Sequence, residues 1–254
     1  MAITVAGVLF VGVGVIEIVF RLLVPITDVP SYFWDPAIGA RRAPNQSGRF
    51  AVGSQLTGRF HFNAQGWNHP HDYVVAKPAG TLRVALVGDS QVEALQVGPD
   101  ETMFAVAERS MNRPDRPVEW YAFGSSGFGT AQEYEVIRRY VLDYQPDVVV
   151  LLFVQNDPFD CSPYLVDLEP YVARYALDAR GELSLQYPTA EWKPSWWRRV
   201  AARSAVVRYF VFQRFVLERI RVLRGASPAR PDVGGLPLRA EVVNTGSRLV
   251  EGLN

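Results

Sequence analysis

Cysteine and histidine are scarce in this sequence, which has one cysteine and three histidines among 254 residues. The single cysteine, Cys161, cannot form a disulfide within the chain. The histidines His61, His69 and His71 form no cluster with the spacing of metal ligands, and neither a phosphate-binding loop nor a dinucleotide fingerprint occurs. The sequence therefore predicts no metal and no cofactor.

An excess of charge of either sign is also absent. Lys and Arg together number 26, and so do Asp and Glu. This balance gives no global reason to expect nucleic acid or another polyanion as a partner. Hydrophobic residues make up 48% of the chain and charged residues 20%, a composition typical of a globular protein with one sizeable core.

The N-terminal segment 1–26 is strongly apolar, and Ala2 to Ile16 carries no charged residue. The run is long enough to cross a bilayer with some tilt, and Glu17 and Arg21 can pair on one helical face. A cleaved signal peptide and a buried helix are the alternatives, but no basic segment precedes the run and no small-residue cleavage site follows it. We expect a single-pass transmembrane anchor over 1–26, with the lipid bilayer as a partner.

The remainder is expected to divide into a spacer and one main domain. Residues 27–80 are polar and turn-rich, and the alternation of residues on both sides of Gly53-Ser54 predicts a β-hairpin. Residues 81–254 are expected to form an α/β domain, in which 161–225 is a variable helical insertion.

The insertion contains a segment with strong helix boundaries. Pro194 precedes Ser195–Arg224 and Gly225 follows it, so one long helix is expected there. The segment is basic and aromatic, and it can lie on a membrane surface or pack on its own sheet.

Short aliphatic runs alternate with helix-compatible segments in the first part of the main domain. The runs are Arg83–Val87, Val118–Phe123 and Asp147–Val154, and the third reads as a fully buried strand. Glu101–Met111 and Thr130–Tyr144 have helical spacing. This alternation predicts a parallel sheet in an α/β sandwich, and a polar cluster follows each strand, where such folds place their ligand sites.

These polar clusters carry a family resemblance. Val87-Gly88-Asp89-Ser90, Ser126-Gly127-Phe128-Gly129 and Gln155-Asn156-Asp157 resemble the first three sequence blocks of the SGNH (GDSL-like) hydrolase superfamily, in the same order. The resemblance covers the chain from Phe60 to Asp160, and it extends loosely to the anchor, as in relatives that accompany polysaccharide modification. It implies a three-layer α/β sandwich of flavodoxin-like type and a serine ester hydrolase or O-acyltransferase.

The resemblance also implies roles for individual residues. Ser90 would be the nucleophile that attacks an ester carbonyl. The backbone N–H groups of Ser90 and Gly127 and the side chain of Asn156 would stabilise the oxyanion that forms. Structural support would come from Gly88, Asp89 and Asp157.

Three departures from the family pattern stand out. Ala122 and Val154 replace an asparagine and a glycine that are usual there. More seriously, the family takes its general base from a late Asp-x-x-His block, and no histidine follows Asn156.

Two explanations for the missing histidine stay open. One is that the protein continues beyond Asn254 with its last strands and the Asp-His pair, which the small predicted sheet favours. The chain would then be a hydrolase or acyltransferase acting on the acyl groups of a surface glycan or lipid through an acyl-Ser90 intermediate. The other is a catalytically inactive glycan-binding or scaffold component of an envelope complex.

The side of the membrane on which the main domain lies is also open. The basic residues Arg21, Arg41 and Arg42 follow the apolar run, which favours a cytoplasmic domain by the positive-inside rule. The family resemblance favours an extracytoplasmic catalytic domain.

Overall fold

The computed structural model describes residues 2–52, 56–155, 157, 171–178, 180–191, 193 and 195–213. These residues fall into two compact units. The smaller unit comprises 2–29, 48–52, 56–59, 193 and 195–213, and the larger unit comprises 30–47, 60–155, 157, 171–178 and 180–191.

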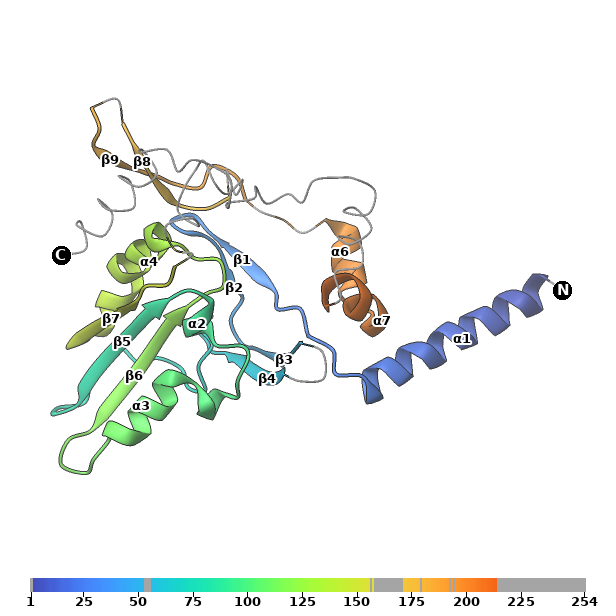
Figure 1. Ribbon diagram of the computed structural model, residues 1–254, viewed down its shortest axis with the longest axis horizontal. Helices are drawn as coiled ribbons and strands as arrows, with labels where there is room; N and C mark the ends of the chain where they lie inside the picture. Colours follow the sequence, from blue (N-terminus) through green and yellow to red (C-terminus); the bar gives the residue numbers. More distant parts are fainter. Residues whose placement is uncertain are drawn as a thin grey trace. The chain divides into compact units, whose positions relative to one another are not determined.

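A three-stranded parallel sheet forms the centre of the larger unit (Figure 1). Its strands are β5 (Leu82–Gly88), β6 (Val118–Gly124) and β7 (Val148–Leu152), in the order β6-β5-β7. Leu86 pairs with Ala122 on one side and with Val150 on the other. The predicted parallel sheet of an α/β fold is therefore confirmed.

Helices follow β5 and β6 along the chain. After β5 come α2 (Ser90–Glu93), the 3-10 helix η1 (Pro99–Glu101) and α3 (Met103–Met111). After β6 come α4 (Thr130–Val136), the π-helical turn η2 (Ile137–Val141) and the 3-10 turn η3 (Leu142–Tyr144).

Helices pack on both faces of the sheet. Successive strand residues point to opposite sides, so each face presents its own set of side chains. One face packs on α4 and η2, through Ala85, Val87, Tyr121, Phe123, Val136 and Val141. The other face packs on α2 and α3, through Leu86, Val92, Phe104 and Ala122. The described part of the sheet thus lies between two helical layers.

The prediction that the third strand is fully buried is wrong. The strand β7 pairs with β5 alone among the described strands, so one of its edges has no described neighbour. Val148 is 44% exposed and Val149 is 38% exposed. The aliphatic sequence indicates a strand, but it does not determine how much of that strand is buried by other segments.

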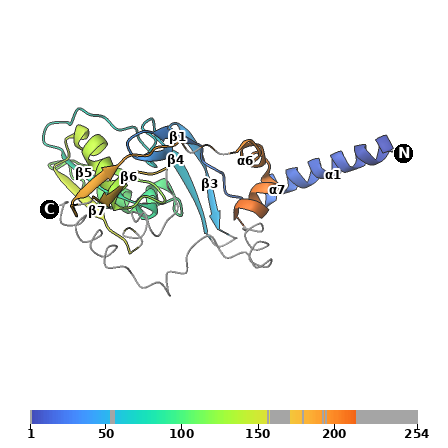
Figure 2. The same ribbon diagram turned by 90° about the horizontal axis from the view of Figure 1, so that it is seen from above.

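Strand pairs precede the central sheet in the chain. The strands β1 (Tyr32–Asp35) and β2 (Gly39–Arg42) are antiparallel, with Tyr32 opposite Arg42. The strands β3 (Gln46–Val52) and β4 (Leu56–Phe62) pair and run side by side in Figure 2. Residues 53–55, where the hairpin turn was predicted, lie outside the described residues.

The described part of the predicted helical insertion contains strands as well as helices. The strands β8 (Arg174–Leu177) and β9 (Leu183–Gln186) form an antiparallel pair in the larger unit. Between them, Asp178 accepts hydrogen bonds from the N–H groups of Arg180 and Glu182. Such an Asx turn reverses the chain, so this stretch is a hairpin.

The prediction of one long helix over Ser195–Arg224 is wrong in its described part. The smaller unit has α6 (Trp196–Ala201), then α7 (Ala205–Val207) and the π-helical η4 (Arg208–Gln213). Ser204 separates α6 from α7 and caps α7, because its hydroxyl accepts a hydrogen bond from Val207 N–H at 3.2 Å. Serine in that position starts a new helix instead of continuing the old one.

The smaller unit also contains α1 (Ala2–Leu23). Arg21 Nε donates to Glu17 Oε1 at 2.8 Å, and Glu17 also accepts from Ser204 Oγ at 2.9 Å and from Ala205 N–H at 2.7 Å. The charged end of α1 is therefore engaged with polar groups. Among the described residues, no helix is long and apolar enough to cross a membrane, which does not fit the transmembrane helix predicted over 1–26.

Candidate active site

The turn after β5 carries Ser90 as the first residue of α2. Asp89 caps this helix, because its Oδ1 accepts a hydrogen bond from Gln91 N–H at 2.9 Å. The Ser90 hydroxyl donates to Asp89 Oδ2 at a longer distance of 3.3 Å. Asp89 is buried and supports the turn through its carboxylate, whereas Ser90 is only half-buried.

Two glycines let this turn sit directly on the sheet. A Cβ atom on Gly88 would lie 2.6 Å from Val92 Cγ2, and a Cβ atom on Gly124 would lie 2.4 Å from Glu93 N. Both distances are shorter than van der Waals contact, so a larger residue at either position would displace α2. Gly88 was predicted as structural support, whereas sequence reasoning missed Gly124, which is 36 residues later and pairs with Gly88 across the strands.

The loop after β6 carries Gly127 beside the Ser90 turn, because Gly88 and Gly124 are paired at the ends of neighbouring strands. Gly127 has φ +84°, in the left-handed region that favours glycine, and a Cβ atom there would meet nothing within 4 Å. Phe128 N–H donates to Ser125 O at 3.1 Å and closes the turn around it. The backbone at Gly127 is therefore open to an approaching ligand.

The turn after β7 is described only in part. Asp157 is buried, and its Oδ2 accepts from Val154 N–H at 2.6 Å while its own N–H donates to Val154 O at 3.1 Å. These two bonds close a tight turn at the carboxyl end of the strand. Asn156, the predicted side-chain donor, lies outside the described residues.

None of the three histidines bonds to Ser90 in the described part of the chain, where the serine hydroxyl has Asp89 as its hydrogen-bond partner. His61 Nδ1 contacts Ser47 Oγ at 2.8 Å. His69 Nε2 contacts Trp120 O at 3.1 Å, and its Nδ1 contacts backbone atoms of His71.

His69 is buried, and its ring stacks on Phe104. Burial, with a smaller contribution from the nearby His71 and His61, lowers the pKa of His69 to about 4, against the opposing effect of its backbone hydrogen bonds. The ring is therefore neutral at pH 7 and serves as a packed, hydrogen-bonded core group.

A buried glutamate on α2 was also missed by sequence reasoning. Glu93 is three residues after Ser90, and its carboxylate pairs with Arg42 of β2 and accepts from Ser126 N–H at 3.0 Å. Its own backbone carbonyl accepts from Asn68 Nδ2 at 2.5 Å. The one available signal was a charged residue inside the apolar run Val92 to Leu95, and nothing in the sequence indicated its partners.

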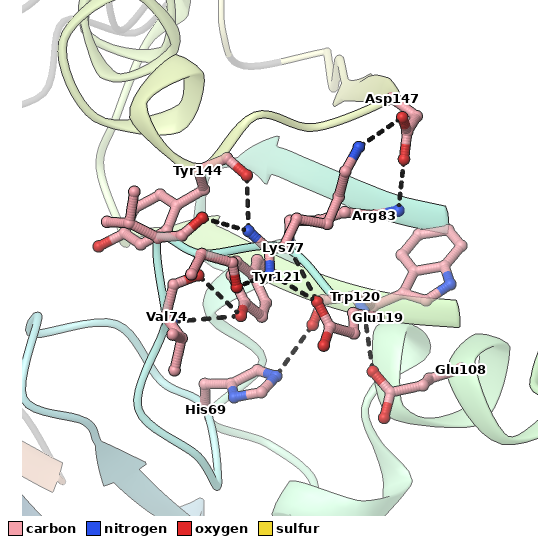
Figure 3. A network of polar contacts seen from close by, with 12 residues as sticks. His69, Val74, Lys77, Arg83, Glu108, Glu119, Trp120, Tyr121, Tyr144 and Asp147 are labelled. Carbon is pink, nitrogen blue, oxygen red and sulfur yellow. Dashed lines mark hydrogen bonds and ion pairs between the residues drawn. The ribbon is translucent and has the colours of Figure 1, made fainter. Parts of the chain in front are cut away.

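The amino end of the sheet holds a different network, centred on Arg83 (Figure 3). Arg83 donates to Glu119 Oε2 at 2.9 Å and to the carbonyl of Tyr144 at 2.7 Å, and its backbone N–H donates to Asp147 at 2.8 Å. Its guanidinium also lies over the Tyr121 ring, 4.8 Å from the centroid. The side-chain donors of Arg83 are occupied by protein groups, so this network holds strands and loops together.

Within the described residues, no group of three or more His, Cys, Asp or Glu side chains could hold a metal ion. Comparison of the sequence with protein-family models gives no match, and comparison with curated proteins gives none either. The chemistry open to this site therefore has to be inferred from the serine, the glycine loop and their supports.

Proposed function

We propose that this protein is a serine-dependent ester hydrolase or O-acyltransferase of SGNH type, with Ser90 as its nucleophile. One observation carries the proposal: a half-buried serine on a strand-to-helix turn lies at the same sheet end as a glycine loop with an open backbone. Ligand sites of parallel sheets lie at this end. A nucleophile next to unhindered N–H donors is the arrangement that acyl transfer requires.

The proposed reaction has two steps. The Ser90 hydroxyl attacks the ester carbonyl, its proton passes to a general base, and the alcohol leaves once protonated, so an acyl-Ser90 ester remains. Water then releases the carboxylic acid, or a sugar hydroxyl takes the acyl group and forms a new ester. In the SGNH pattern the N–H groups of Ser90 and Gly127 and the Asn156 amide stabilise both oxyanions, with Gly88, Asp89 and Asp157 as support.

The proposed substrates are acyl groups, such as acetyl groups, of a surface glycan or lipid. This part rests on the resemblance of the three sequence blocks to proteins that accompany polysaccharide modification. An extracytoplasmic location and partners in an envelope complex belong to the same proposal.

The test is turnover of p-nitrophenyl acetate by the full chain together with labelling by a fluorophosphonate, which reacts with activated serines. Ser90→Ala is expected to lower kcat/KM by at least about 10³-fold and to abolish labelling, because the proposed reaction passes through an acyl-Ser90 ester. Ser110→Ala is the matched control, since Ser110 is exposed on α3 and its hydroxyl donates to the Val106 carbonyl at 2.8 Å. Unchanged turnover in Ser90→Ala would overturn the assignment.

A second function is favoured by the surroundings of the serine. Ser90 donates to a carboxylate, and His69 is held by backbone groups away from it. A chain that neither turns over esters nor reacts with the fluorophosphonate, but binds an acetylated oligosaccharide, would be an inactive glycan-binding component. Isothermal titration calorimetry with acetylated and deacetylated forms of the same oligosaccharide distinguishes recognition of the acyl group from binding of the sugar alone.

A further inference from the structure

The Glu93 carboxylate has a complete set of partners, although it is fully buried. It accepts from Arg42 Nε at 2.5 Å and from Arg42 Nη2 at 3.0 Å. It also accepts from Ser126 N–H at 3.0 Å and from the Ser126 hydroxyl. An ionised carboxylate is stable inside a protein only when it is paired and hydrogen-bonded in this way.

Arg42 is held on the other side of the pair. It belongs to β2, its guanidinium lies 4.4 Å from the centroid of the Tyr32 ring, and its Nη1 donates to the Tyr32 hydroxyl. The side chains of Arg42 and Glu93 are 6% and 0% exposed. The planar guanidinium presents two N–H groups to the carboxylate and so fixes its orientation as well as its charge.

The position of the pair connects two parts of the candidate active site. Glu93 belongs to the same helical turn as Ser90, and Ser126 immediately precedes Gly127. The Glu93 carboxylate therefore ties the turn that carries the serine to the loop that carries the glycine, and Arg42 anchors it to the β1–β2 hairpin.

We infer that Glu93, held by Arg42, is a positioning residue that sets the separation between the Ser90 hydroxyl and the Gly127 N–H. The inference rests on the proposed function. Oxyanion donors act mainly in the transition state, so a small displacement of the Gly127 loop lowers kcat more than it changes KM. The β1–β2 hairpin then contributes to the active site without touching the substrate.

The experiment compares Glu93→Gln with Arg41→Lys. The glutamine has the shape of the glutamate but replaces one acceptor oxygen with a donor and leaves Arg42 without a counter-charge. Arg41 is the matched control, because it is buried in β2 next to Arg42 and pairs with Asp35 at 3.3 Å instead of with Glu93. We expect kcat to fall by about 10- to 100-fold in Glu93→Gln with KM within about twofold, and to stay within about twofold in Arg41→Lys.

A milder variant covers the case in which Glu93→Gln does not fold. Ser126→Ala removes one hydroxyl at an exposed position and leaves the Ser126 N–H in place, so folding should be preserved and kcat should fall by about three- to tenfold. Wild-type kcat in Ser126→Ala would overturn the inference while leaving Ser90 as the nucleophile, unless a folded Glu93→Gln shows the expected fall in kcat.

Amide hydrogen exchange gives a readout that does not depend on turnover. The Ser126 N–H should exchange at least about tenfold faster in Glu93→Gln than in the wild type, and at the wild-type rate in Arg41→Lys. If the wild type neither turns over ester nor reacts at Ser90, the proposed function fails, and exchange alone then decides whether Glu93 holds the loop. Unchanged Ser126 exchange in a folded Glu93→Gln would overturn the inference in either case.

Discussion

The two ends of the parallel sheet each bury an arginine paired with a glutamate, yet the groups around the two pairs differ. At the amino end, the guanidinium of Arg83 is surrounded by Glu119, backbone carbonyls and the Tyr121 ring. At the carboxyl end, Glu93 of the Arg42–Glu93 pair shares the helical turn of the half-buried Ser90 and accepts from Ser126 N–H, next to the open Gly127 backbone.

The difference separates a purely structural network from one that supports a site. A network whose donors all meet protein acceptors contributes stability and a single arrangement of the strands. Where polar groups next to such a network remain accessible to solvent, the same buried contacts hold those groups in position for a ligand. The comparison predicts that substitutions at the amino end change stability, whereas those at the carboxyl end change activity.

The largest effect on stability is expected from Arg83→Met. The Arg83 side chain is 1% exposed, so its removal leaves Glu119 without a counter-charge and the Tyr144 carbonyl without its donor. We expect a loss of about 3–5 kcal/mol in the free energy of unfolding, measured by urea denaturation. Glu119→Gln is the control: Glu119 is 31% exposed and water can replace its contacts, so about 1 kcal/mol is expected. Equal losses in the two variants would contradict the assignment of Arg83 as the buried centre.

An intermediate effect is expected from lowering the pH, through His69. Because burial lowers the pKa of His69 to about 4 from an ordinary value of 6.5, the unfolded chain binds a proton between these pH values that the folded chain does not bind. Stability is therefore highest above pH 6.5 and falls as the pH drops towards 4, and this group contributes a loss of about 2 kcal/mol between pH 7 and pH 5. Urea denaturation at both pH values measures it.

The variants His69→Gln and His61→Gln test the source of this pH dependence. We expect His69→Gln to lose most of it and His61→Gln to retain it, because His61 is less buried and contacts the Ser47 hydroxyl. Retention of the full pH dependence in His69→Gln would show that another group carries it.

The smallest stability effect, and the sharpest test of the comparison, comes from two glycines in the same backbone conformation. Gly127 has φ +84° at the carboxyl end, and Gly80 has φ +78° shortly before β5 at the amino end. A Cβ atom would meet nothing within 4 Å at either position. Replacement of each by alanine should therefore cost about 1 kcal/mol of backbone strain.

Only one of these two variants should affect activity. Gly127→Ala should also lower kcat for p-nitrophenyl acetate by about tenfold, because relief of the backbone strain at φ +84° shifts the proposed oxyanion N–H, while Gly80→Ala should leave kcat unchanged. Equal kcat values in the two variants would remove Gly127 from the proposed site.

The central sheet was predictable because its signals are local. The runs that became β5, β6 and β7 are short, aliphatic and separated by helix-compatible segments, and this alternation alone predicts parallel pairing. The positions of Ser90 and Gly127 at strand ends follow from the same pattern. The exposure of β7 could not be predicted from its sequence, because the burial of a strand depends on which other segments pack against it.

A further error also came from local reasoning. The segment Ser195–Arg224 has helix boundaries at both ends, yet Ser204 caps a new helix inside it. Serine is tolerated within helices and favoured at their starts, and only the backbone path decides between the two. The apolar sequence of α1 indicates a hydrophobic helix, but it gives no sign that Glu17 contacts Ser204, 187 residues away.

By itself, the sequence determined the α/β alternation, the strand ends that carry Ser90 and Gly127, and the scarcity of histidine that makes the general base an open question. Only the tertiary structure decided that Gly88 and Gly124 let α2 lie against the sheet, that His69 is buried and neutral, and that Arg42 reaches Glu93 across 51 residues. The physical reason is the range of the interactions. Strand and helix signals are set by neighbouring residues, whereas burial, close approach and charge pairing exist only after distant segments have packed.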